Sequence, residues 1–136
     1  MNLNRQNLPT NQFDRPIKAR WKLWLRVLFF VACIVIIHES LIPAQSASIP
    51  TVSDKLVHFG AYFTLVVLAA IAFPKARLTN IVGLMILLGT VLEGAQGVMG
   101  LGRSASVGDL LANMIGASAP ACLWVVLLWL TTSRHR

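Results

Sequence analysis

Acids, bases and amides gather beside apolar stretches between residues 54 and 113. Asp54 and His58 are four residues apart, and Tyr62 follows at the same interval. Residues three or four apart share one face of an α-helix, so these side chains point in one direction. Glu93 and Gln96 are three residues apart, and Asp109 and Asn113 are four apart. Together with the nearby cations Lys55 and Arg103, the candidate site residues are Asp54, Lys55, His58, Glu93, Gln96, Arg103, Asp109 and Asn113.

These residue types support three kinds of chemistry. His58, oriented by Asp54 or Glu93, is a candidate general base. Lysine and arginine beside carboxylates favour a ligand with both hydrogen-bond donors and acceptors. The same groups can instead fix the register of packed helices. No nucleophile stands out, because Ser104 and Ser106 have no motif around them, so the sequence leans away from an enzyme and predicts no cofactor or metal.

The composition identifies the solvent of most of the chain. Of 136 residues, 56% are hydrophobic and only 12% are charged, and the mean hydropathy is +0.68. A soluble protein needs a more polar surface than this, so we expect a membrane protein whose main partners are lipids. The net charge of +7 comes from residues that flank apolar stretches, which argues against a nucleic-acid partner. Cys33 and Cys122 lie inside apolar runs and indicate no disulfide.

Four stretches are long enough to cross a bilayer as helices. They are predicted at Leu23 to Ile42, Leu56 to Phe73, Leu78 to Gly97, and Val107 or Leu110 to Leu130. Backbone polar groups in lipid must be satisfied within each helix, so the predicted fold is all-α, an antiparallel bundle of about four transmembrane helices. The predicted domains are a flexible basic tail (1–22), the membrane domain (23–131) and a basic tail (132–136).

Charge predicts the orientation of the bundle. Ten of the 12 lysines and arginines belong to the two tails, the start of the first span and the turn after the second, which leaves only Lys55 and Arg103 on the opposite side. The positive-inside rule therefore places both termini in the cytoplasm. Trp21, Trp24, Trp124 and Trp129 lie near the predicted cytoplasmic ends, as an aromatic belt would.

One alternative concerns the first span. Basic residues, the run VLFFVACIVII and the small residues of PAQSASIP resemble a secretory signal peptide. The long basic leader and the polar pair His38-Glu39 directly after the run favour an uncleaved span. These two residues are interpreted as ordinary interfacial groups.

The candidate residues fall at the predicted non-cytoplasmic ends of the helices, with Arg103 in the loop after the third span. Asp54 and Asp109 lie in first turns, where the helix dipole favours an acid, and Ser53 and Ser106 are possible N-caps. Glu93 is different because it lies near the end of its helix, where the dipole disfavours a carboxylate. It therefore needs a partner, and the candidates are Arg103 and Lys55. We expect it to face inward, in a polar cluster with Arg103 and His58.

Three segments carry a resemblance to a known family. They are SDKLVHFGAYFTL, EGAQ after the next apolar run, and LGRSASVGDLLANMIG. Over about residues 50 to 120 the chain resembles the VanZ-like family of small bacterial membrane proteins, whose namesake is linked to low-level teicoplanin resistance. The matching positions are Asp54, Lys55, His58, Glu93, Gln96, Arg103, Asp109, Asn113 and Gly116. VMGLG replaces the expected aromatic and proline before Arg103, and Pro120 replaces a small residue and should kink the last helix.

The resemblance implies a multi-pass protein of the bacterial cytoplasmic membrane, and it implies no reaction. The leading hypothesis is a non-enzymatic protein whose outer-face polar pocket binds an envelope component, such as a lipid-linked precursor or a glycopeptide, and affects teicoplanin susceptibility. One alternative is an envelope enzyme that uses His58 as general base. The other is a structural or assembly subunit of a membrane complex.

Overall fold

The four predicted spans are four helices. The computed structural model describes residues 14–42, 54–99 and 105–133. It contains α1 (Asp14–Leu41), α2 (Asp54–Ala72), α3 (Leu78–Met99) and α4 (Val107–Ser133), and no strand occurs in the described ranges. All four helices are long and apolar enough to cross a membrane. The chain is therefore an all-α, multi-pass membrane protein.

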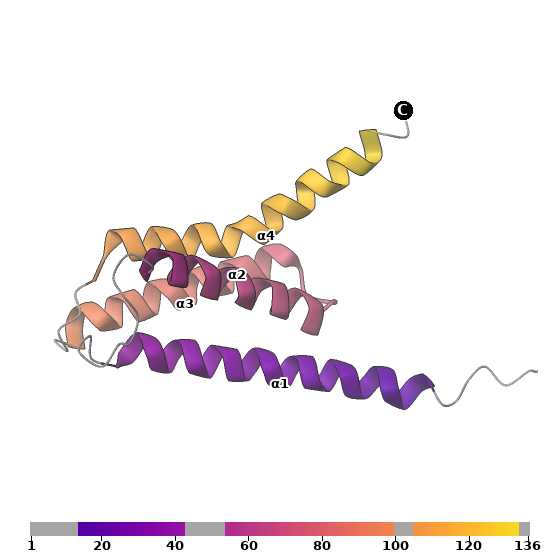
Figure 1. Cartoon of the computed structure of the whole chain (residues 1–136), viewed down its shortest axis with the longest axis horizontal. Coiled ribbons are helices and arrows are strands. Elements are labelled where there is room, and N and C mark those ends of the chain that lie inside the picture. The colour runs from indigo at the N-terminus through magenta and orange to yellow at the C-terminus, as the bar shows by residue number, and fades with distance from the viewer. Residues whose placement is uncertain (1–13, 43–53, 100–104, 134–136) are drawn as a thin grey trace, which may run out of the picture.

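The helices alternate in direction, as the short connections require. Figure 1 shows α1 and α3 running opposite to α2 and α4, so that the start of α1 and the end of α4 lie at the same end of the bundle. The N-terminal ends of α2 and α4 meet the C-terminal ends of α1 and α3 at the opposite end. Polar residues near these four ends can therefore meet at one depth.

Only the first helix departs clearly from its predicted bounds. We predicted a structureless tail up to residue 22, but α1 already begins at Asp14. Pro16 does not prevent this start, because proline is accepted in the first turn of a helix, where the amide hydrogens have no intrahelical partner. The rest of the predicted N-terminal tail lies outside the described residues. At the other end, α4 continues to Ser133.

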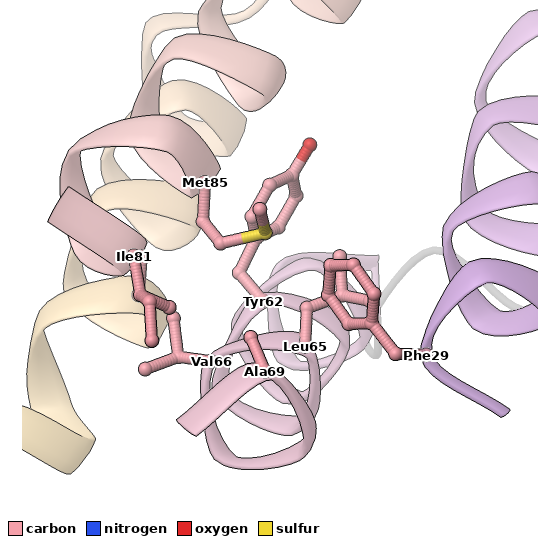
Figure 2. Close-up of a cluster of buried hydrophobic side chains, with 8 residues drawn as sticks. Phe29, Tyr62, Leu65, Val66, Ala69, Ile81 and Met85 are labelled. Atoms are coloured by element: carbon pink, nitrogen blue, oxygen red, sulfur yellow. The ribbon is translucent and has the colours of Figure 1, made fainter. Parts of the chain in front are cut away.

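The buried core is centred on α2. Tyr62, Leu65, Val66 and Ala69 form its inner face and are almost completely buried. Figure 2 shows Phe29 reaching this face from α1, and Ile81 and Met85 reaching it from α3. Most large apolar side chains elsewhere on the helices are exposed on the protein surface, as expected where the surrounding solvent is lipid.

Small residues allow the helices to approach closely. A Cβ atom added to Gly116 on α4 would lie 2.9 Å from the Cα atom of Phe59 on α2. A Cβ atom added to Gly89 on α3 would lie 3.1 Å from both the Asn113 Cβ atom and the Tyr62 ring. Membrane helices pack through such small residues because van der Waals contact replaces the hydrophobic effect in lipid. This packing fixes how α2, α3 and α4 present their polar ends.

The other end of the bundle is more open. Pro120 lies inside α4, and Figure 1 shows the second half of α4 leaving the bundle. Residues 122–133 are all exposed. An apolar cavity of about 660 Å³ lies between this half and the α2–α3 turn, with Ile71, Pro74 and Trp124 among its lining residues. The predicted kink at Pro120 agrees with this divergence, because proline removes a helical hydrogen bond.

Arg26 of α1 binds the C-terminal end of α2 at this end of the bundle. The Arg26 Nε–H donates to the Ala72 carbonyl at 3.4 Å, and its guanidinium lies 5.4 Å from the centre of the Phe73 ring. A cation is favoured at a helix C-terminus. Arg26 is thus a charged residue within the apolar span of α1, and its side chain pairs with the C-terminus of α2.

Candidate functional site

Seven of the eight predicted site residues lie at one end of the bundle, which we call the polar end. They come from the first turns of α2 and α4 and the last turns of α3, and they are Asp54, Lys55, His58, Glu93, Gln96, Asp109 and Asn113. Arg103 lies outside the described residues, so its predicted contact with Glu93 is untested. Glu93, Gln96 and Asn113 are buried.

Glu93 accepts a hydrogen bond from the backbone N–H of Ser106. Ser106 in turn caps α4, since its Oγ atom accepts from the Asp109 N–H at 3.3 Å. In a capping box, a glutamate in the first turn bonds the N-cap N–H of its own helix. Here Glu93 supplies that bond from the end of α3. Although its own helix dipole is unfavourable, the carboxylate lies at the positive end of the α4 dipole.

Gln96, one turn later on α3, caps the C-terminus of a neighbouring helix. Its amide nitrogen donates to the Ser40 carbonyl at 2.7 Å. That carbonyl belongs to the last turn of α1, where the final four carbonyls lack an intrahelical partner. The i, i+3 pair of α3 therefore caps both neighbouring helices, one at its N-terminus and the other at its C-terminus. Ser40 was not among the predicted residues, because its contribution is a backbone atom that every residue carries.

Glu93 has the partner that it was expected to need, but this partner is not Lys55. Its carboxylate bonds the Ser106 backbone, and Lys55 pairs with Asp109 instead. The physical reason is the N-terminus of α4, whose first N–H groups lack an intrahelical partner. The grouping of Glu93 with His58 stays a prediction, and the hydrogen bond of His58 goes to Asn113.

His58 is held from two sides. Its Nδ1 atom lies 2.9 Å from the Asn113 Oδ1 atom on α4, and its Nε2 atom lies 3.8 Å from the Asp54 Oδ1 atom one turn earlier on α2. Asn113 is only 2% exposed, so its amide is fixed by packing. Asp54, His58 and Tyr62 lie on successive turns of α2, as predicted, and Tyr62 is buried.

Lys55 and Asp109 form the remaining cross-helix pair. The Lys55 Nζ atom lies 3.5 Å from the Asp109 Oδ1 atom, and the side chains are 67% and 16% exposed. Within the described ranges, this Asp109 oxygen is buried and has no hydrogen-bond partner. The pair joins α2 to α4 beside His58. His38 and Glu39 contact each other at 3.3 Å and are both exposed, as expected of interfacial residues.

The structure thus divides the predicted set in two. Glu93, Gln96 and Asn113 are buried and engaged with a helix end or with His58. The other four described residues stand on α2 and α4 with less complete internal pairing, and they are Asp54, Lys55, His58 and Asp109. The buried group joins the helix ends and holds His58, and the second group contains the side chains that are less completely paired.

Comparisons with protein-family models, with curated proteins and with solved structures find no match to this chain. A function is therefore inferred from the polar end itself and from the family resemblance of its motifs.

Proposed function

We propose that this chain is a VanZ-like integral membrane protein of the bacterial cell envelope, and that its polar end binds an envelope component without catalysing a reaction. The supporting observation is the group Asp54, Lys55, His58 and Asp109, which the helix caps leave available. Charge supports an orientation in which this end faces away from the cytoplasm, since most lysines and arginines belong to the other side.

The chemistry of the group favours a ligand with both anionic and donor groups. Lys55 offers an exposed ammonium, and Asp54 offers a carboxylate that is 56% exposed. Lipid-linked precursors carry phosphates and hydroxyls, and a glycopeptide carries a carboxylate and many amides, so both classes have matching groups. The VanZ resemblance adds teicoplanin susceptibility as the phenotype.

Susceptibility of a sensitive bacterium tests this proposal. The host expresses the wild type, Lys55→Gln or Asp109→Asn, and the amount of each protein in the membrane is measured. Glu39→Gln is the matched control, because it removes an exposed carboxylate that does not belong to the group Asp54, Lys55, His58 and Asp109. We expect the wild type and the control to raise the teicoplanin concentration needed for inhibition, and the two site variants to lose this effect at equal abundance. If equally abundant site variants protect as well as wild type, or if wild type gives no protection, the proposal is wrong.

One observation favours catalysis as the second candidate. The bond from His58 to Asn113 leaves the Nε2 atom facing Asp54, which is the arrangement of a base oriented by a second group. Under this alternative, His58→Ala abolishes turnover of an envelope substrate while binding persists. Under the binding proposal, His58→Ala has no turnover to abolish.

A further inference from the structure

Three potential metal ligands converge on the outer side of the polar end. One carboxylate oxygen each of Asp54 and Asp109 and one ring nitrogen of His58 all lie within 4.8 Å of one another. The residues come from two helices, so helical spacing alone does not explain their approach. The close packing of α4 on α2 at Gly116 brings them together.

The hydrogen bond of His58 assigns its protonation. The Asn113 amide oxygen is the atom beside Nδ1, so Nδ1 carries the proton and donates it. In a neutral ring Nε2 then presents a lone pair to the Asp54 carboxylate, 3.8 Å away. Two acceptors that face each other attract a cation, which is either a proton on Nε2 or a metal ion. Histidines that bind metals commonly donate the other ring N–H to a fixed oxygen, as His58 does to Asn113.

Asp109 gives an independent observation. Its Oδ1 atom is buried and lacks a hydrogen-bond partner among the described residues. Its ion-pair partner in the described part of the chain is the Lys55 Nζ atom at 3.5 Å, on a side chain that is largely exposed. Lys55 can therefore swing into solvent when another cation takes its place. A buried oxygen without a hydrogen bond is a ready metal ligand.

From this geometry we infer a binding site for a divalent transition-metal ion, with the Asp54 carboxylate, His58 Nε2 and Asp109 Oδ1 as protein ligands. One imidazole and two carboxylates suit zinc or a similar first-row ion. Three ligands leave a coordination position for water or a bound anion. The site goes beyond the proposed envelope function and does not depend on it.

Zinc titration of the purified protein in detergent tests the site. After removal of metal with a chelator, calorimetry is expected to show one zinc bound per chain. Asp54→Asn and His58→Ala should each weaken binding by about 10-fold or more, and Asn113→Leu by about 10- to 100-fold through loss of the oriented ring. Lys55→Gln should tighten binding, since it removes the competing ammonium.

The chain supplies its own control. His38→Ala removes the histidine of the His38–Glu39 pair, which has no third potential metal ligand among the described residues. This variant should leave zinc affinity unchanged. Asp54 is exposed, so Asp54→Asn tests the site without disturbing the core, and a thermal melt of each metal-free variant checks folding. The inference is overturned if wild type binds no zinc saturably, if folded Asp54→Asn and His58→Ala bind as tightly as wild type, or if Lys55→Gln binds more weakly. The titration contains no envelope ligand and the susceptibility assay no added metal, so each result stands alone.

Discussion

Replacement of Glu93 measures the cap that joins α3 to α4. Glu93 is 6% exposed and its carboxylate accepts the Ser106 N–H. Glu93→Gln keeps an acceptor but removes the charge. Glu93→Leu has a similar size, removes the acceptor and leaves the Ser106 N–H unpaired.

The expected losses follow from the strength of the bond. A hydrogen bond to a charged group contributes about 1.5–3 kcal/mol to stability and a neutral one about 0.5–1.5 kcal/mol. Glu93→Gln should therefore lower the free energy of unfolding by about 1–2 kcal/mol. Glu93→Leu should lower it by about 3 kcal/mol, since the bond is lost and a donor is left without a partner. Glu39→Gln changes an exposed carboxylate and should cost less than about 0.5 kcal/mol.

Thiol reactivity during heating measures this stability in detergent. Cys33 is partly buried against the core, whereas Cys122 is exposed. In a Cys122→Ser background, a thiol-reactive dye reports the temperature at which Cys33 becomes accessible. The expected order of melting temperatures is wild type and Glu39→Gln, then Glu93→Gln, then Glu93→Leu. If Glu93→Leu melts with the wild type, Glu93 does not cap α4.

Two further predictions concern packing and shape. Gly116→Ala should destabilise the protein by about 1–3 kcal/mol, because the added methyl group overpacks against the α2 backbone. Gly94→Ala should be neutral or stabilising, because nothing lies within 4 Å of the added Cβ atom. Thermal melts compare the two variants, and equal melting temperatures would contradict the close approach of α4 to α2. Pro120→Ala should restore the helical hydrogen bond and straighten α4. Spin labels at Lys75 and Thr131, in a chain with both cysteines changed to serine, should then come closer together, and an unchanged distance would show that Pro120 does not set the bend.

The sequence predicted the spans because lipid imposes a simple condition on length and polarity. It also predicted that Glu93 faces inward, since a carboxylate near a helix C-terminus needs a partner. It did not predict that the partner of Glu93 is the Ser106 N–H, because every residue except proline carries a backbone N–H and the sequence does not distinguish one from another. Spacing placed Asp109 and Asn113 on one face, but only the packing of α4 on α2 shows that they approach Lys55 and His58.

The length of α4 has a consequence for the surrounding bilayer. Its 27 residues span about 40 Å at 1.5 Å per residue, whereas the 19 residues of α2 span about 28 Å and match a hydrocarbon layer of about 30 Å. A helix longer than the layer relieves the mismatch by tilting or bending, and α4 has its bend at Pro120. In a thicker bilayer the second half of α4 would tilt less from the bilayer normal, and the apolar cavity beside it would become narrower. In a thinner bilayer the same half would tilt more, and the cavity would become wider. Bilayer thickness thereby becomes a control on the shape of this end of the protein.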